Sequence, residues 1–118
     1  AAEEIPDEVQ GLNREFFEFY VTKRGHHPNA RGGFTTTSDL SFLNYALNDH
    51  IAEISPRPVL FIVGEQAESR FFSDMAFEQA AEPKRMLVVP VCNHVDLYDD
   101  TAKIPFDEIE RFLHENLQ

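Results

Sequence analysis

The sequence is poor in basic residues, holds one cysteine and contains no tryptophan. Ten Lys and Arg stand against 21 Asp and Glu, which gives a net charge of −11. Nonspecific binding to nucleic acid or to an anionic membrane needs a cationic surface, so the sequence predicts neither kind of binding. One cysteine excludes an internal disulfide. No apolar run approaches the roughly 18 residues of a membrane span, and the acidic N-terminus lacks a signal-peptide layout. A cytoplasmic protein is therefore predicted.

Motifs for nucleotide and metal binding are also missing. There is no G-x-G-x-x-G, no P-loop and no paired-cysteine motif, and neither Ser69 nor Ser73 lies in G-x-S-x-G. The neighbouring His26 and His27 point in different directions, and a pair formed by His94 and Asp96 lacks a third ligand. The sequence therefore predicts no cofactor and no metal.

The chain of 118 residues has room for one small domain, and 42% of its residues are hydrophobic, including 11 phenylalanines. Its two parts differ. Residues 1–57 have helical and loop-like patterns, whereas residues 58–118 alternate strand and helix. The first part predicts a helix from about Pro6 and a second after Thr37 or Ser38. The second helix is expected to continue to the proline-rich stop at 55–58, because apolar residues recur at spacings of three and four: Leu40, Leu43, Leu47, Ile51 and Ile54.

The second part predicts a βαβα unit. Two continuous apolar runs, at about 59–63 and 86–91, are typical of parallel strands buried on both faces. Helices are expected from Ser73, as an N-cap, to about residue 81 and again over 105–117. Two such strands cannot form a complete sheet, so the chain is interpreted as one end of a larger α/β sheet. The unpaired edge of strand 59–63 predicts a homodimer or a strand-exchanged assembly.

His94 is the first candidate for chemistry, because it follows the carboxyl end of a predicted strand, where open α/β sheets place their sites. Glu65 and Glu68 follow the other strand and are candidates to orient the imidazole. Adjacent parallel strands bring these loops together. Alternatives stay open: a surface histidine, two solvated glutamates, or a nucleophilic pair of Cys92 with His94.

Residues 54–118 carry a family resemblance. The phrase ISPRPVLFIVG and the later phrase NHVDLYD resemble the C-terminal part of an α/β-hydrolase, in the bacterial group similar to dienelactone hydrolases and acetyl-xylan esterases. The helical part before the strands resembles the insertion of that group. The resemblance implies an α/β fold in which the βαβα portion, preceded by a helical insertion, forms one partial domain. It further implies a fragment, a truncated product or one chain of a split enzyme.

This resemblance also implies a chemistry. His94 would be the general base of Ser–His–acid hydrolysis of an ester or related acyl bond, with Glu68 or Glu65 as the acid. Ala67 stands where many members have Asp, and Asn93 where they have Gly. The nucleophile would lie outside the chain, so the chain alone is expected to be inactive. The implied partners are a small-molecule ester-like substrate, the missing half of the sheet and a second copy. The alternative is a non-catalytic acidic interaction and oligomerisation module.

Overall fold

The computed structural model describes residues 4–30 and 35–117. The chain divides into two compact units, residues 1–50 and residues 51–118. The boundary falls a few residues before the expected change of pattern at 57/58. The second unit holds both strands, and all the site residues lie in it.

The described residues of the first unit form two helices, α1 (Gly11–Tyr20) and α2 (Ser38–Leu43). The predicted second helix is wrong in length, because α2 ends at Leu43 and only a 3₁₀ turn, η1 (Ile51–Ile54), follows in the second unit. The Asn44 side chain donates to the Leu40 carbonyl over 2.7 Å. Asparagine favours such local bonds over a continuing helix. The apolar stripe is therefore interrupted, and Leu47 is 70% exposed.

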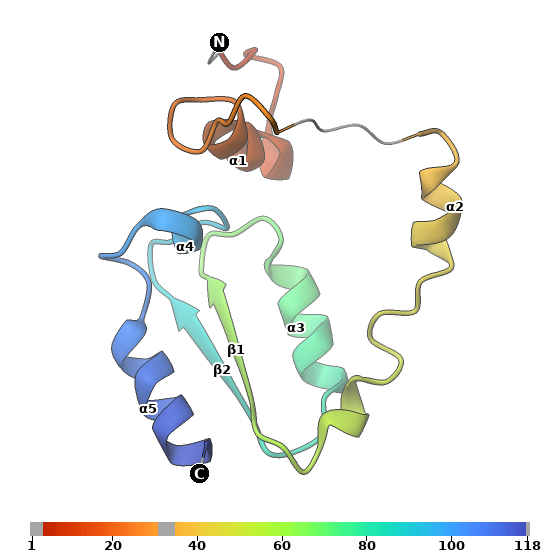
Figure 1. Ribbon diagram of the computed structural model, residues 1–118, viewed down its shortest axis with the longest axis vertical. Coiled ribbons are helices and arrows are strands. Elements are labelled where there is room, and N and C mark those ends of the chain that lie inside the picture. Colours follow the sequence, from red (N-terminus) through yellow and green to blue (C-terminus); the bar gives the residue numbers. More distant parts are fainter. Residues whose placement is uncertain (1–3, 31–34, 118) are drawn as a thin grey trace. The chain divides into compact units, whose positions relative to one another are not determined.

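The second unit is a small parallel α/β arrangement (Figure 1). Strands β1 (Val59–Gly64) and β2 (Lys84–Val89) pair in parallel, from Val59 opposite Lys84 to Gly64 opposite Val89. Helix α3 (Arg70–Gln79) connects them, and α4 (Asp96–Asp99) and α5 (Phe106–Asn116) follow β2. This confirms a mixed α/β fold with two parallel strands.

Helices α3 and α5 lie on either side of the strands (Figure 1). The Lys84 Nζ donates to the carbonyls of Phe77 and Ala80 at the end of α3, at 2.7 and 2.8 Å. The next residue, Arg85, forms an ion pair with Glu108 of α5 at 3.7 Å. Neighbouring strand residues point to opposite faces, so these two contacts place one helix on each face.

The most buried residues gather at the carboxyl ends of the strands. Residues 59–62 of β1 are only partly buried, so the prediction of strands buried on both faces holds only where they end. The buried apolar residues of the described chain are Val63, Ala67, Ala80, Val89, Cys92 and Val95, of which Cys92 and Val95 are fully buried. Most of this core lies in or next to the loops that follow β1 and β2. In the described part of the chain, no helix is long and apolar enough to cross a bilayer.

Candidate functional site

A pocket of about 280 Å³ lies at the carboxyl end of the two strands. Its polar lining consists of two serines, one histidine and one tyrosine, and the remainder is mostly apolar. The lining residues are Ile62, Val63, Gly64, Ala67, Ser69, Phe72, Ser73, His94, Leu97 and Tyr98. An apolar pocket with a few convergent polar groups at this edge of a parallel sheet is the usual form of a small-molecule site.

The imidazole of His94 is held between two hydroxyl groups. Its Nδ1 lies 2.6 Å from the Ser69 Oγ, and its Nε2 lies 2.7 Å from the Tyr98 Oη. The rings of His94 and Tyr98 also meet edge to face, with centroids 5.3 Å apart. Ser69 precedes α3 and Tyr98 lies in α4, so residues from both strand-end loops define the orientation of the ring.

The two hydroxyls differ in the role each suits. A phenol is more acidic than an aliphatic alcohol and is the stronger hydrogen-bond donor, so the Tyr98 hydroxyl is the better donor to an imidazole lone pair. The tautomer that follows has the proton on Nδ1, donated to the Ser69 Oγ, while Nε2 accepts from Tyr98. This assignment makes Nε2 the basic atom of His94.

Ser69 occupies the N-cap position of α3 but makes no side-chain capping bond. Its hydroxyl is bonded to His94, which lies 25 residues away in the sequence. The prediction that Ser73 caps this helix is wrong, because α3 begins at Arg70 and Ser73 lies inside it. A serine at a helix start usually bonds to the helix itself. Its use for the imidazole marks Ser69 as part of the site.

The two predicted glutamates take different places. Glu65 lies directly after β1, and its Oε2 accepts the Val91 N–H over 3.1 Å. Glu68 is exposed in the same loop, one residue before Ser69. The imidazole nitrogens bond to the hydroxyls of Ser69 and Tyr98. The triad role of Glu68 or Glu65 therefore stays a prediction. His94 lies in the pocket, as a base must, and its catalytic role also stays a prediction.

The loop that carries His94 is braced by Asn93 and Asp96. The Asn93 N–H donates to the Asp96 Oδ2 over 3.1 Å, and the Asp96 N–H donates to the Asn93 Oδ1 over 2.9 Å. The Lys103 Nζ lies 2.6 Å from the same Oδ2, and this hydrogen bond raises the pKa of Lys103. These contacts fix the start of α4. Asp96 therefore bonds to the neighbouring loop residue Asn93 and to Lys103.

Cys92 lies in the same loop as His94 and is fully buried. Its Sγ donates to the Asn93 carbonyl over 3.4 Å. Burial raises the pKa of the Cys92 thiol, and the nearby Asp96 carboxylate raises it further. A thiol that resists ionisation is a poor nucleophile. This environment favours a structural cysteine over the alternative pair with His94.

Tyr98 and Lys103 are site residues that reasoning from the sequence missed. Tyr98 follows His94 by four residues, the spacing that brings two side chains together on one helical turn. That signal was available once a helical turn was assumed at 96–99. Lys103 carried no comparable signal, because its contact depends on how the chain turns after α4.

Fold and site together define a small parallel α/β unit with a histidine-centred pocket at the strand ends. The chain is similar to the uncharacterized protein PA2218 of Pseudomonas aeruginosa, with 49% identity over 106 residues, covering 87% of this chain and 29% of that protein. It is also similar to the uncharacterized protein YcjY of Escherichia coli, with 34% identity over 93 residues, covering 77% of this chain and 30% of YcjY.

A crystal structure of PA2218 matches the fold with a TM-score of 0.88 and 45% identity, over 97% of this chain and 36% of that one. No protein-family model matches the chain. These matches overturn the assignment to the C-terminal part of an α/β-hydrolase, because the relatives carry no hydrolase name and none of the family models supports it. The chain spans less than a third of the length of the two curated relatives.

Proposed function

We propose that His94 is the general base of a site that hydrolyses an ester or a related acyl bond. The observation that carries this proposal is the line of hydrogen bonds Ser69–His94–Tyr98, at 2.6 and 2.7 Å, inside an apolar pocket. A histidine held at one nitrogen and basic at the other is the arrangement that acyl-transfer chemistry requires of its base.

Each residue has a separate part in this reaction. The Nδ1–H bond to Ser69 holds the ring and keeps the proton on that nitrogen. Nε2 takes the proton of an attacking hydroxyl and returns it, as imidazolium, to the leaving group. The attacking hydroxyl approaches Nε2 at the position that the Tyr98 hydroxyl occupies in this structure. Tyr98 is 42% exposed, so its side chain can leave when substrate enters.

The attacking serine and the oxyanion donors belong, in this proposal, to a polypeptide region outside these 118 residues. Ser69 is assigned to orient the base, because its partner is Nδ1 and the phenol of Tyr98 faces the basic Nε2. Glu68 remains the proposed acid, whereas the Glu65 carboxylate accepts the Val91 N–H. The substrate is a small ester-like molecule, no cofactor takes part, and the acidic composition and lone cysteine favour the cytoplasm.

The test compares hydrolysis of p-nitrophenyl esters by the product of the complete reading frame that contains this chain. His94→Ala is expected to lower kcat by about 10²- to 10⁴-fold, because a positioned acid–base group contributes on that order. His114→Ala is the matched control, since His114 is an exposed histidine on α5 with 79% of its side chain accessible. An unchanged kcat in the His94 variant would contradict the proposal.

A second arm tests where the nucleophile lies. The purified 118-residue chain is expected to show no hydrolysis above background. Ser69→Ala in the full product is expected to cause a partial loss, because the imidazole loses one of its two hydrogen-bond partners and the base itself is kept. A burst of acyl-enzyme from the isolated chain that disappears in Ser69→Ala would make Ser69 the nucleophile, and would refute its assignment as an orienting group.

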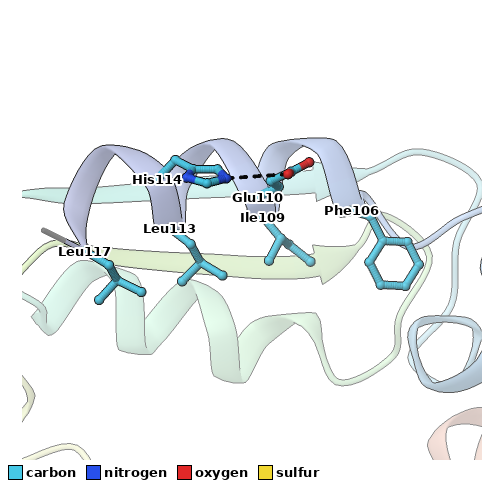
Figure 2. Close-up of a pocket in the computed structure, with 6 residues that line it drawn as sticks. All are labelled: Phe106, Ile109, Glu110, Leu113, His114 and Leu117. Atoms are coloured by element: carbon cyan, nitrogen blue, oxygen red, sulfur yellow. Dashed lines mark ion pairs between the residues drawn. The ribbon is translucent and has the colours of Figure 1, made fainter.

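An oligomerisation module is the second candidate function, and the exposed apolar side of α5 favours it. Figure 2 shows Phe106, Ile109, Leu113 and Leu117 along one side of that helix. Phe106 is 54% exposed and Leu117 is 72% exposed. Together with the free edge of β1 in the described residues, this face suits a second copy of the chain.

A further inference from the structure

Val91 has an unusual backbone conformation at the start of the loop that carries His94. Its φ is +50°, in the left-handed region, and it is the only non-glycine residue with a positive φ in the described part of the chain. A β-branched side chain is strongly disfavoured there. Such a conformation persists only when surrounding contacts enforce it. Contacts that hold Val91 should therefore be visible around it.

The residues that follow β1 supply those contacts. The Glu65 Oε2 accepts the Val91 N–H over 3.1 Å, while the Glu65 backbone N–H donates to the Val89 carbonyl over 2.8 Å. The next amide, of Gln66, donates to the Cys92 carbonyl over 2.9 Å. Bonds from residues 65 and 66 thus hold the chain on both sides of Val91. The carboxylate of Glu65 is the one side-chain group among them.

Gly64 lets the two loops approach closely enough for these bonds. A Cβ placed at Gly64 would overlap the carbonyl oxygen of Cys92. The backbone after Val91 therefore packs directly on the end of β1. Three residues after Val91, the same loop delivers His94 into the pocket. The direction in which the chain leaves Val91 consequently determines where the imidazole lies.

We infer that Glu65 is a positioning residue for His94, and that it acts through the Val91 N–H. In this role the carboxylate serves as a hydrogen-bond acceptor, and its negative charge is not required. The inference rests on the proposed function of His94 as a base. It also differs from the triad role first considered for Glu65, in which the charge would stabilise the imidazolium.

The test uses NMR of the 118-residue chain, which needs no substrate. It measures amide exchange at Val91, together with the tautomer and titration of the His94 imidazole. Glu65→Gln keeps an acceptor oxygen and is expected to match the wild type on all three. Glu65→Ala is expected to raise Val91 exchange by about tenfold, as for loss of a charge-assisted hydrogen bond. It is also expected to reduce the Nδ1–H population of His94.

A rescue variant isolates the backbone effect. Glycine adopts a positive φ without strain, so Val91→Gly is expected to restore the His94 tautomer in the Glu65→Ala background. Glu78→Ala, which removes an exposed carboxylate from α3, serves as the matched control. Far-ultraviolet circular dichroism checks that each variant folds.

Two results would overturn the inference. In one, Glu65→Gln behaves like Glu65→Ala and shifts the titration of His94, which would assign the charge to the imidazole. In the other, the Glu65→Ala spectra match the wild type. Both readouts are independent of hydrolysis. A chain that gives the expected spectra while the full product lacks esterase activity would refute the proposed function and leave the positioning role intact.

Discussion

His94 and Cys92 lie two positions apart in one loop, yet their surroundings differ sharply. The imidazole lies at a pocket between two hydroxyls, whereas the thiol is fully buried and bonded to a carbonyl. Burial therefore leaves only the imidazole accessible from the pocket. The two glutamates are both exposed, and the Glu65 carboxylate accepts the Val91 N–H.

The raised pKa of Cys92 predicts a loss of stability at alkaline pH. An unfolded thiol ionises near about 8.5, while the buried one stays protonated to higher pH. The Cys92 thiol therefore contributes its full stabilisation to the free energy of unfolding below the pKa of the unfolded thiol. This contribution is lost as the pH rises through the higher pKa of the folded state. Urea unfolding between pH 7 and about 10 should show the decline, and Cys92→Ala should flatten it. Equal slopes in both proteins would count against this explanation.

At the scale of elements, the strands could be predicted from the sequence and the short helices could not. An apolar run bounded by Pro58 and Gly64 is a local signal, and β1 matches it almost residue for residue. By contrast, α4 has four residues and begins where Asn93 and Asp96 exchange hydrogen bonds. Periodicity carries little information over so short a segment.

The start of α3 shows the same division for the candidate site. Ser73 was the predicted N-cap, but α3 begins at Arg70, and the hydroxyl of Ser69 before it bonds to His94, 25 residues further along the chain. A long-range contact of this kind leaves no mark on local sequence. The place of His94 at the strand ends could be predicted from the sequence, while its hydrogen-bond partners depended on the tertiary structure.

The brace at the start of α4 predicts a cost for removing Asp96. Asp96→Ala leaves the Asn93 N–H without its acceptor and removes the partner of Lys103. We expect a loss of about 1 to 3 kcal/mol in the free energy of unfolding, as for other caps and charge-assisted bonds. Urea denaturation measures it. Glu78→Ala should change stability by less than about 0.5 kcal/mol, and an equal loss in both variants would contradict the role of the brace.

At the scale of the whole molecule, the two-stranded sheet of the described residues has no further strand beside the outer edge of β1. The N–H groups of Val59 and Glu65 point to β2, because they bond to the carbonyls of Pro83 and Val89. In a strand, alternate residues point their N–H groups to opposite edges, so those of Leu60 and Ile62 point away from β2. This edge is where the proposed second copy would pair.

Light scattering is expected to give the mass of a dimer for the purified chain. Leu60→Pro removes an outward N–H without touching the bonds to β2, and it should yield a monomer with its secondary structure intact. Phe61→Pro, the matched variant on the inward register, should disrupt the sheet instead. A wild-type monomer, or a dimer that survives Leu60→Pro, would argue against pairing through this edge.

Gly64 gives the two strand-end loops a shared evolutionary constraint. Because any side chain at this position would displace the Cys92 carbonyl, a substitution there can be accommodated only if the neighbouring loop shifts as well. Insertions and deletions in either loop face the same barrier. Amino-acid substitutions in segments 64–69 and 89–98 are therefore expected to occur together among related sequences.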